Sequence, residues 1–265
     1  MTNVRTTVQT INDTPILHFA FRILHFPKGA AMANTKSRSL GPGLSTAEQV
    51  AGFCYLPFYV VLLALAIQWL SGLLGLNLTE VQVNACFFVV NCIVIWVIFH
   101  NFLLRSFRAI RFWELVQALI LGFCLYYAGN FIFSWITNLL GLTIVSYNDM
   151  TIQSLMADNY WVMAVCSVIV APLVEETLVR GLLFGVIHRQ SRMAAYVVTI
   201  VFFAAIHVWQ YLLAYDISSV LLAVLQYIPA GIALGWTYEK CNTIWGPIFL
   251  HMAINAISVG IISIL

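Results

Sequence analysis

Residues 161–187 read WVMAVCSVIVAPLVEETLVRGLLFGVI, an apolar stretch that contains three charged residues, Glu175, Glu176 and Arg180. About 20 apolar residues in a helix span the hydrocarbon core of a bilayer, so this stretch is long enough to cross a membrane. Charged side chains inside a membrane are costly and usually mark a function. The stretch therefore predicts both a membrane helix and a candidate site.

The composition of the whole chain agrees with a membrane protein. Of its 265 residues, 62% are apolar and 8% are charged, whereas about a quarter of the residues in a soluble domain are charged. The net charge of +2 is too small to attract nucleic acid. These values exclude a soluble globular domain and a nucleic-acid-binding protein.

Seven apolar stretches have the length of a membrane helix. A transmembrane β-barrel would instead show alternating segments of about ten residues. We therefore predict an all-α fold, a polytopic membrane helical bundle with about seven transmembrane helices. The expected spans lie near 50–75, 82–104, 113–140, 161–187, 194–213, 218–237 and 243–264.

The cations predict the orientation of the bundle. All Lys and Arg residues except Arg180 lie before the first span or in the loops that follow the second, fourth and sixth spans. Because positive loops stay in the cytoplasm, we expect a cytoplasmic N-terminus and an external C-terminus. The short loops and this clear charge bias indicate a multi-pass protein of a bacterial cell membrane.

The three charges of the fourth span are predicted to differ in role. Glu176 and Arg180 are four residues apart, so their side chains can pair on one helix face. Glu175 is turned about 100° away and has no partner nearby in the sequence. We therefore expect Glu175 to be the candidate base. An ion pair that only fixes helix packing is the alternative interpretation of the trio.

Three further polar residues interrupt the fifth and seventh spans: His207, His251 and Asn255. His251 and Asn255 are four residues apart and share a helix face. A single histidine on an apolar face is more often a packing residue. However, counting residues along the spans places Glu175, His207 and His251 in the cytoplasmic half or near the midplane, where they could meet. We therefore expect one site that faces the cytoplasm.

These residue types suit the hydrolysis of a peptide bond. A glutamate and a histidine that share a water molecule can remove its proton and later protonate a leaving amine. A second histidine and an asparagine can donate hydrogen bonds to the oxyanion of a tetrahedral intermediate. The sequence contains no HExxH motif, no GxSG motif and no aspartate inside a span, so it lacks the motifs of other intramembrane proteases.

Three motifs follow one another along the last four expected spans: Glu175-Glu176-x-x-x-Arg180, Phe203-x-x-x-His207 and His251-x-x-x-Asn255. In this order they resemble the CPBP family (CAAX protease and bacteriocin processing, also called ABI). These intramembrane proteases are relatives of the Ras-converting CAAX endopeptidase. The resemblance covers residues 160–260 approximately.

The resemblance implies a role for each of these residues. Glu175 and His207 would activate a water molecule. His251 and Asn255 would stabilise the oxyanion. The other three would shape the site or pack within it: Glu176, Arg180 and Phe203.

The resemblance leaves two cofactor states open. We favour a metal-free, glutamate-dependent mechanism with no cofactor, because Asn255 suits a hydrogen-bond donor better than a zinc ligand. In the alternative metalloprotease, zinc would be held by Glu175, His207 and His251.

The implied organisation has three parts. Residues 1–49 form a cytoplasmic tail that is disordered or, at 15–33, amphipathic; residues 50–140 form accessory helices; and residues 160–265 form the catalytic core. The implied function is an intramembrane endopeptidase in the lipid bilayer that acts on a peptide or a membrane-anchored protein. Its role would be bacteriocin immunity, maturation of a pheromone or surface protein, or CAAX-like cleavage. A non-catalytic membrane scaffold or immunity protein that binds a partner is the alternative.

Overall fold

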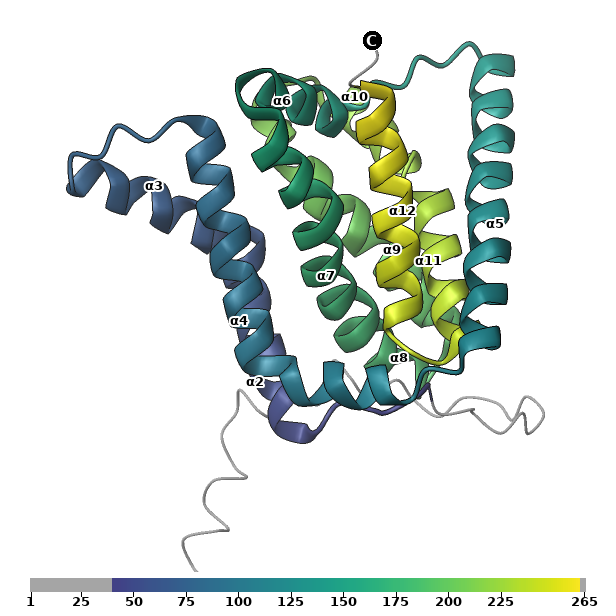
Figure 1. Ribbon diagram of the computed structural model, residues 1–265. Helices are drawn as coiled ribbons and strands as arrows, with labels where there is room; N and C mark the ends of the chain where they lie inside the picture. Colours follow the sequence, from purple (N-terminus) through teal and green to yellow (C-terminus); the bar gives the residue numbers. More distant parts are fainter. Residues whose placement is uncertain (1–39, 263–265) are drawn as a thin grey trace, which may run out of the picture. The chain divides into compact units, whose positions relative to one another are not determined.

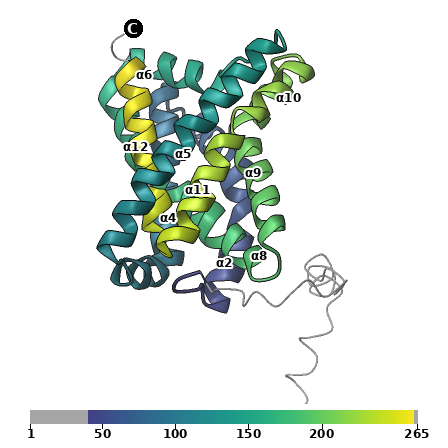
Figure 2. The ribbon, with the colours of Figure 1, turned by 90° about the vertical axis from the view of Figure 1, so that its right-hand side faces the viewer.

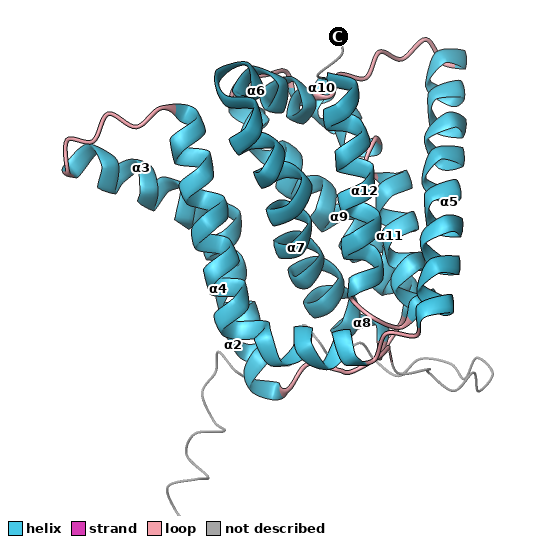
Figure 3. Ribbon diagram, viewed as in Figure 1, coloured by secondary structure: helices cyan, strands magenta, loops and turns pink. Residues whose placement is uncertain are grey.

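The computed structural model describes residues 40–262, and all regular structure in this range is helical (Figures 1 and 3). The predicted all-α fold is confirmed. Residues 1–39, with the possible amphipathic segment at 15–33, lie outside the described residues. The helices are α2 Thr46–Pro57, α3 Leu63–Leu73, α4 Glu80–Arg108, α5 Phe112–Leu139, α6 Tyr147–Val165, α7 Ala171–Glu176, α8 Gly185–His188, α9 Arg192–Val208, α10 Ile217–Leu225, α11 Ile228–Cys241 and α12 Trp245–Ile262.

Six helical segments of the described chain are long and apolar enough to cross a membrane, which makes the protein a polytopic helical membrane protein. Each of them overlaps one of the first six expected spans, although the fourth begins at Tyr147, well before the expected residue 161. The seventh expected span forms α12, which has 18 residues and is not among the six. The six segments are Thr46–Leu73, Glu80–Arg108, Phe112–Leu139, Tyr147–His188, Arg192–Leu213 and Ile217–Cys241.

The helix ends form two groups (Figure 1). The starts of α2, α5, α9 and α12 lie at the same end of the bundle as the ends of α4, α8 and α11. We call this the cationic end, because it carries Arg105, Arg108, Arg111, Arg189, Arg192 and Lys240. The loops 74–79, 140–146 and 214–216 contain no Lys or Arg and lie at the opposite end.

A buried carboxylate joins α2 to α4 at the cationic end. Ser45 caps the start of α2, and its hydroxyl accepts a hydrogen bond from the backbone N–H of Glu48. The Glu48 carboxylate returns to the backbone N–H of Ser45 and also accepts from the backbone N–H of Phe102. Arg105 lies 2.9 Å from the same carboxylate. α2 therefore begins at Thr46, inside the expected tail of residues 1–49.

Three π-helical turns interrupt the expected α-helices: η1 Phe58–Leu62, η2 Cys166–Val170 and η3 Thr177–Phe184. Such turns add a residue to the helical repeat and are frequent at functional sites. η1 joins α2 to α3, and α3 bends away from the bundle beyond it (Figure 1). η2 and η3 flank α7, which carries Glu175 and Glu176. The sequence pattern did not predict these turns.

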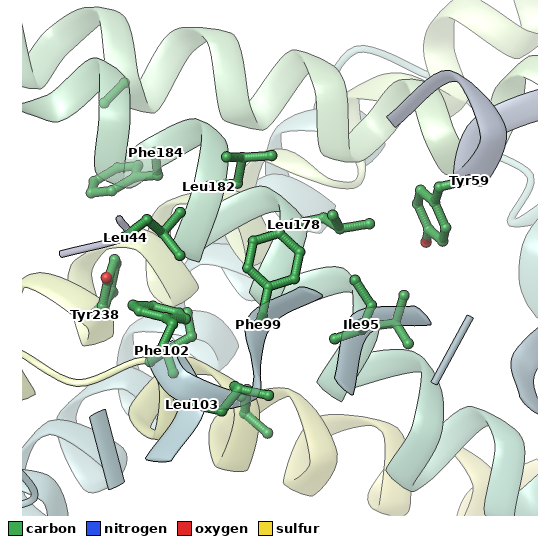
Figure 4. Close-up of a cluster of buried hydrophobic side chains, with 14 residues drawn as sticks. Leu44, Tyr59, Ile95, Phe99, Phe102, Leu103, Leu178, Leu182, Phe184 and Tyr238 are labelled. Atoms are coloured by element: carbon green, nitrogen blue, oxygen red, sulfur yellow. The ribbon is translucent and has the colours of Figure 1, made fainter. Parts of the chain in front are cut away.

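Figure 4 shows the largest hydrophobic cluster of the described residues, whose members range from the middle of α4 to the helix ends beside the cationic end. It combines side chains from η3, from the second half of α4 and from the turn between α11 and α12. Each member is at most 8% exposed. The core includes Leu44, Ile95, Phe99, Phe102, Leu103, Leu178, Leu182, Phe184, Tyr238, Ile244 and Ile248.

α5 closes one side of the bundle by packing closely along α11 (Figure 2). The approach depends on Gly122, because a Cβ atom at this position would collide with the hydroxyl of Thr237. Leu119 and Phe123 of α5 pack beside Leu234 in a second hydrophobic cluster. The accessory helix α5 therefore forms one wall of the bundle that holds the candidate site.

Candidate active site

A cavity of about 490 Å³ lies within the helical bundle. The four predicted catalytic residues all line it: Glu175 from α7, His207 from α9, and His251 and Asn255 from α12. These residues lie on three different helices, so the fold brings together groups that are far apart in the sequence. The expected meeting of these side chains is found.

Glu175 and His207 face each other in this cavity. Glu175 Oε2 lies 3.6 Å from His207 Nε2, just beyond direct hydrogen-bond distance. Glu175 Oε2 is buried and has no hydrogen-bond partner in the described chain. His207 Nδ1 lies 2.7 Å from the backbone carbonyl oxygen of Phe203. A carbonyl oxygen can only accept, so Nδ1 carries a hydrogen, and in the neutral form of the ring the lone pair of Nε2 faces Glu175.

Glu176 makes the ion pair that its spacing predicted. Its Oε1 atom accepts a hydrogen bond from Arg180 Nη1 at 3.0 Å, and both side chains are 0% exposed. The same Oε1 atom lies 2.9 Å from His251 Nδ1. Glu176 therefore orients both an arginine of its own helix and a histidine of α12.

Phe203 packs between the polar groups of the site. Its ring centroid lies 4.6 Å from that of His207 and 5.7 Å from that of His251. The guanidinium carbon of Arg180 lies 4.5 Å from the same ring centroid, within the range of a cation–π contact. The expected contact between Phe203 and His207 is therefore found, and Phe203 also contacts His251 and Arg180.

Asn255 is held by the helix that precedes Glu175. Its Nδ2 atom donates a hydrogen bond to the backbone carbonyl oxygen of Ser167 at 2.8 Å. Ser167 lies in η2, one of the π-helical turns. The hydrogen bond to Ser167 fixes the side chain of Asn255. Nδ2 carries a second hydrogen, which can still be donated to another group.

The described residues do not fit the alternative zinc site. In the part of the chain that the structure describes, no group of three or more His, Cys, Asp or Glu residues is arranged to hold a metal ion. A catalytic zinc needs three such ligands. Of the expected set, Glu175 and His207 face each other, and His251 Nδ1 faces Glu176.

Comparison with known families supports the interpretation of the motifs. Residues 157–257 match the family model described as type II CAAX prenyl endopeptidase Rce1-like. The predicted resemblance is confirmed for this segment. We call residues 157–257 the Rce1-like segment; it contains all seven predicted site residues. No curated protein and no solved structure significantly matches the chain.

The cavity also extends beyond the Rce1-like segment. None of the lining residues from η1 to α5 was predicted; the polar ones are Tyr59 of η1, Gln68 of α3, Asn84 of α4, and Tyr126 and Asn130 of α5. The sequence did offer a signal for three of them, because an isolated carboxamide in an apolar span needs a polar surrounding. The accessory helices therefore form part of the wall around the candidate site.

The cavity extends in a direction that was not expected. We expected the site to face the cytoplasm, hence the cationic end. The lining residues farthest from Glu175 instead lie near the opposite end: Asn84 at the start of α4, Asn148 and Asp149 at the start of α6, and Gln210 after α9. Counting residues along each span predicted how deep the catalytic side chains lie in the membrane. It could not show which end of the bundle is filled by the hydrophobic core.

Proposed function

We propose that the protein is an intramembrane endopeptidase in which Glu175 and His207 activate a water molecule. The observation that carries the proposal is the 3.6 Å separation of Glu175 Oε2 and His207 Nε2 in the cavity. One water molecule can lie within hydrogen-bond distance of both atoms. The substrate is a peptide or a membrane-anchored protein, and the protein lies in a bacterial cell membrane with its N-terminus in the cytoplasm.

Glu175 and His207 can each accept one hydrogen bond from the same water molecule. The ionised Glu175 carboxylate accepts one hydrogen of the water, and His207 Nε2 accepts the other, because Nδ1 already donates to Phe203. The lone pairs of the water oxygen then remain free to attack a carbonyl carbon. This arrangement assigns Glu175 the role of general base.

The reaction then proceeds in two steps. The water oxygen forms a bond to the scissile carbonyl carbon while its proton passes to Glu175, and the carbonyl oxygen becomes an oxyanion. The C–N bond then breaks, and Glu175 returns the proton to the leaving amine. The products are a carboxylic acid and an amine, and Glu175 is again ionised.

His251 and Asn255 are proposed to stabilise the oxyanion. Asn255 donates through the second hydrogen of Nδ2. His251 can donate through Nε2 only when the ring is protonated, because Nδ1 already donates to Glu176. The Glu176 carboxylate is placed to balance that positive charge. Oxyanion donors of this kind typically contribute a factor of about 10²–10³ to kcat.

Glu175→Gln tests this proposal. The change keeps the shape of the side chain but removes the base, so peptide cleavage should fall by about 10²–10⁴-fold, the usual contribution of general acid–base catalysis. Purified protein in proteoliposomes is incubated with a peptide library, and new termini are detected by mass spectrometry. Glu80→Gln, at an exposed position in the first turn of α4, is the matched control.

The outcome also separates the alternatives. Cleavage that depends on Glu175 and persists in a zinc chelator supports the metal-free mechanism. Cleavage that is lost in the chelator and restored by zinc would contradict it and support a metal held by Glu175, His207 and His251. If a cellular function of the protein survives Glu175→Gln and His207→Ala unchanged, the protein is a scaffold and not a peptidase.

A further inference from the structure

We propose that peptide substrates enter the cavity from the non-cytoplasmic side of the membrane, and that carboxamide side chains of the outer cavity bind the peptide backbone. The role of the entering molecule as a substrate rests on the function proposed above. The direction of access does not, because it follows from how the cavity and the hydrophobic core are distributed along the bundle.

The cationic end offers no route to Glu175. The hydrophobic core of Figure 4 occupies that end, and its members Phe99, Leu178 and Leu182 are 0% exposed. Glu176, the residue after Glu175, and Arg180, one helical turn further along the chain, are also 0% exposed. A peptide that approached from this end would have to displace the best-packed part of the molecule.

The opposite end is connected to Glu175 by a continuous lining. The lining residues that precede Glu175 along the chain are Asp149, Ile152 and Leu155, before the kink of α6 at Asn159, and then Met163, Ser167 and Ala171, which lead to Glu175. Along α12, Val259, Ser258 and Asn255 lead to His251 in the same way. The cavity therefore runs from the end without cations to the catalytic groups.

The charge pattern indicates to which side of the membrane the cavity opens. The described loops that carry Lys and Arg all lie at the cationic end, and positive loops remain in the cytoplasm. The end at which the cavity opens is therefore the non-cytoplasmic one. A substrate would be a peptide segment that has already crossed the membrane or is anchored in its outer leaflet.

The lining indicates the chemistry of that segment. Carboxamides surround the outer cavity, and each has both a donor and an acceptor, as the backbone of an extended peptide requires. The Nε2 atom of Gln226 is buried without a hydrogen-bond partner in the described chain, so it has a donor to offer. Among the described lining residues none is Lys or Arg, and Asp149 is acidic, which favours neutral or cationic peptides. The carboxamides are those of Gln68, Asn84, Asn130, Asn148, Gln210 and Gln226.

Single cysteines in oriented membranes test the direction of access without requiring activity. Asn148→Cys probes the cavity mouth, Ser167→Cys probes the interior beside Asn255, and Gln190→Cys probes the exposed loop at the cationic end. Right-side-out and inverted vesicles are treated with a membrane-impermeant cationic thiol reagent. Mass spectrometry locates the modified residue, so the six native cysteines need no replacement.

We expect Asn148→Cys and Ser167→Cys to be modified in right-side-out vesicles, and Gln190→Cys to be modified only in inverted ones. Modification of Ser167→Cys only in inverted vesicles would overturn the proposal, as would modification from neither side. Modification of Gln190→Cys in right-side-out vesicles would mean that the bundle is inverted and would overturn it as well. Because none of these results depends on cleavage, failure here is distinct from failure of the proposed peptidase activity.

Discussion

Glu175 and Glu176 are neighbours in the sequence, but they belong to two different regions of the molecule. Glu176 is not among the residues that line the cavity; its carboxylate is fully buried, and its Oε1 atom is held by Arg180 and His251. Glu175 lines the cavity, where Oε2 faces His207 without a direct hydrogen bond. Two identical side chains thus lie on opposite sides of the boundary between a sealed region and an open one.

This difference indicates a structural role for Glu176 and a chemical role for Glu175. A carboxylate with fixed partners cannot easily exchange protons, but it can hold other groups in place. A carboxylate without a partner is poorly suited to stabilise the fold, but it can bind water and substrate. Substitutions in the sealed region should therefore change stability, whereas substitutions around the cavity should change activity.

The largest effect in the sealed region is expected for Glu176→Gln. Removing one partner of a buried ion pair leaves the other charge uncompensated, which typically costs about 3–5 kcal/mol. The free energy of unfolding, measured by SDS titration in mixed micelles, should fall by about this amount. Glu175→Gln is the matched control, because it makes the same chemical change one residue away and should leave the free energy of unfolding nearly unchanged.

The double variant Glu176→Gln/Arg180→Met sharpens the comparison. It removes both charges and keeps similar volumes, so it should recover most of the lost stability. Equal destabilisation by Glu175→Gln and Glu176→Gln would show that the two carboxylates do not belong to different regions.

Around the cavity, Asn255→Ala should lower kcat by about 10²–10³-fold, the usual cost of removing an oxyanion donor. The lost hydrogen bond to Ser167 should change the free energy of unfolding by only about 1 kcal/mol. The measurements are single-turnover cleavage and SDS titration. Asn130→Ala is the control for kcat: its side chain also lines the cavity and donates to a backbone carbonyl, but it lies on α5, away from the proposed oxyanion site. As one of the carboxamides proposed to bind the peptide backbone, it should change KM and leave kcat unaltered. A change in KM without a change in kcat for Asn255→Ala would contradict the proposed role.

Hydropathy and charge were enough to predict much of this arrangement. The spans follow from the length of the apolar stretches, and the pair of Glu176 and Arg180 follows from a four-residue spacing. Both depend on local geometry, which a helix determines over a few residues. The contact between Phe203 and His207 follows from the same helical repeat.

The features that the sequence did not predict depend on packing between distant segments. The π-helical turns η2 and η3 have no distinctive amino-acid composition. The apolar pattern of residues 161–187 therefore predicted an uninterrupted α-helix. The contact of His251 with Glu176 joins residues 75 positions apart. The filling of one end by the hydrophobic core depends on the long side chains of α4 and η3, and no count of residues along a single helix could show it.

The smallest effect is expected at the mouth of the cavity, for Asp149→Asn. Asp149 is exposed and carries a negative charge at the open end, so it should attract cationic peptides. An exposed pair of charges at contact distance contributes about 1 kcal/mol in water, which corresponds to a change of about fivefold in KM. KM for a lysine-containing peptide should therefore rise by about this factor at low salt, with kcat unchanged. The difference should shrink as ionic strength increases, because salt screens exposed charges.

Asp158→Asn, which makes the same change outside the cavity lining, should leave KM unaltered. Equal effects of the two substitutions would mean that the charge acts on the whole membrane surface, and that the cavity mouth does not select the substrate.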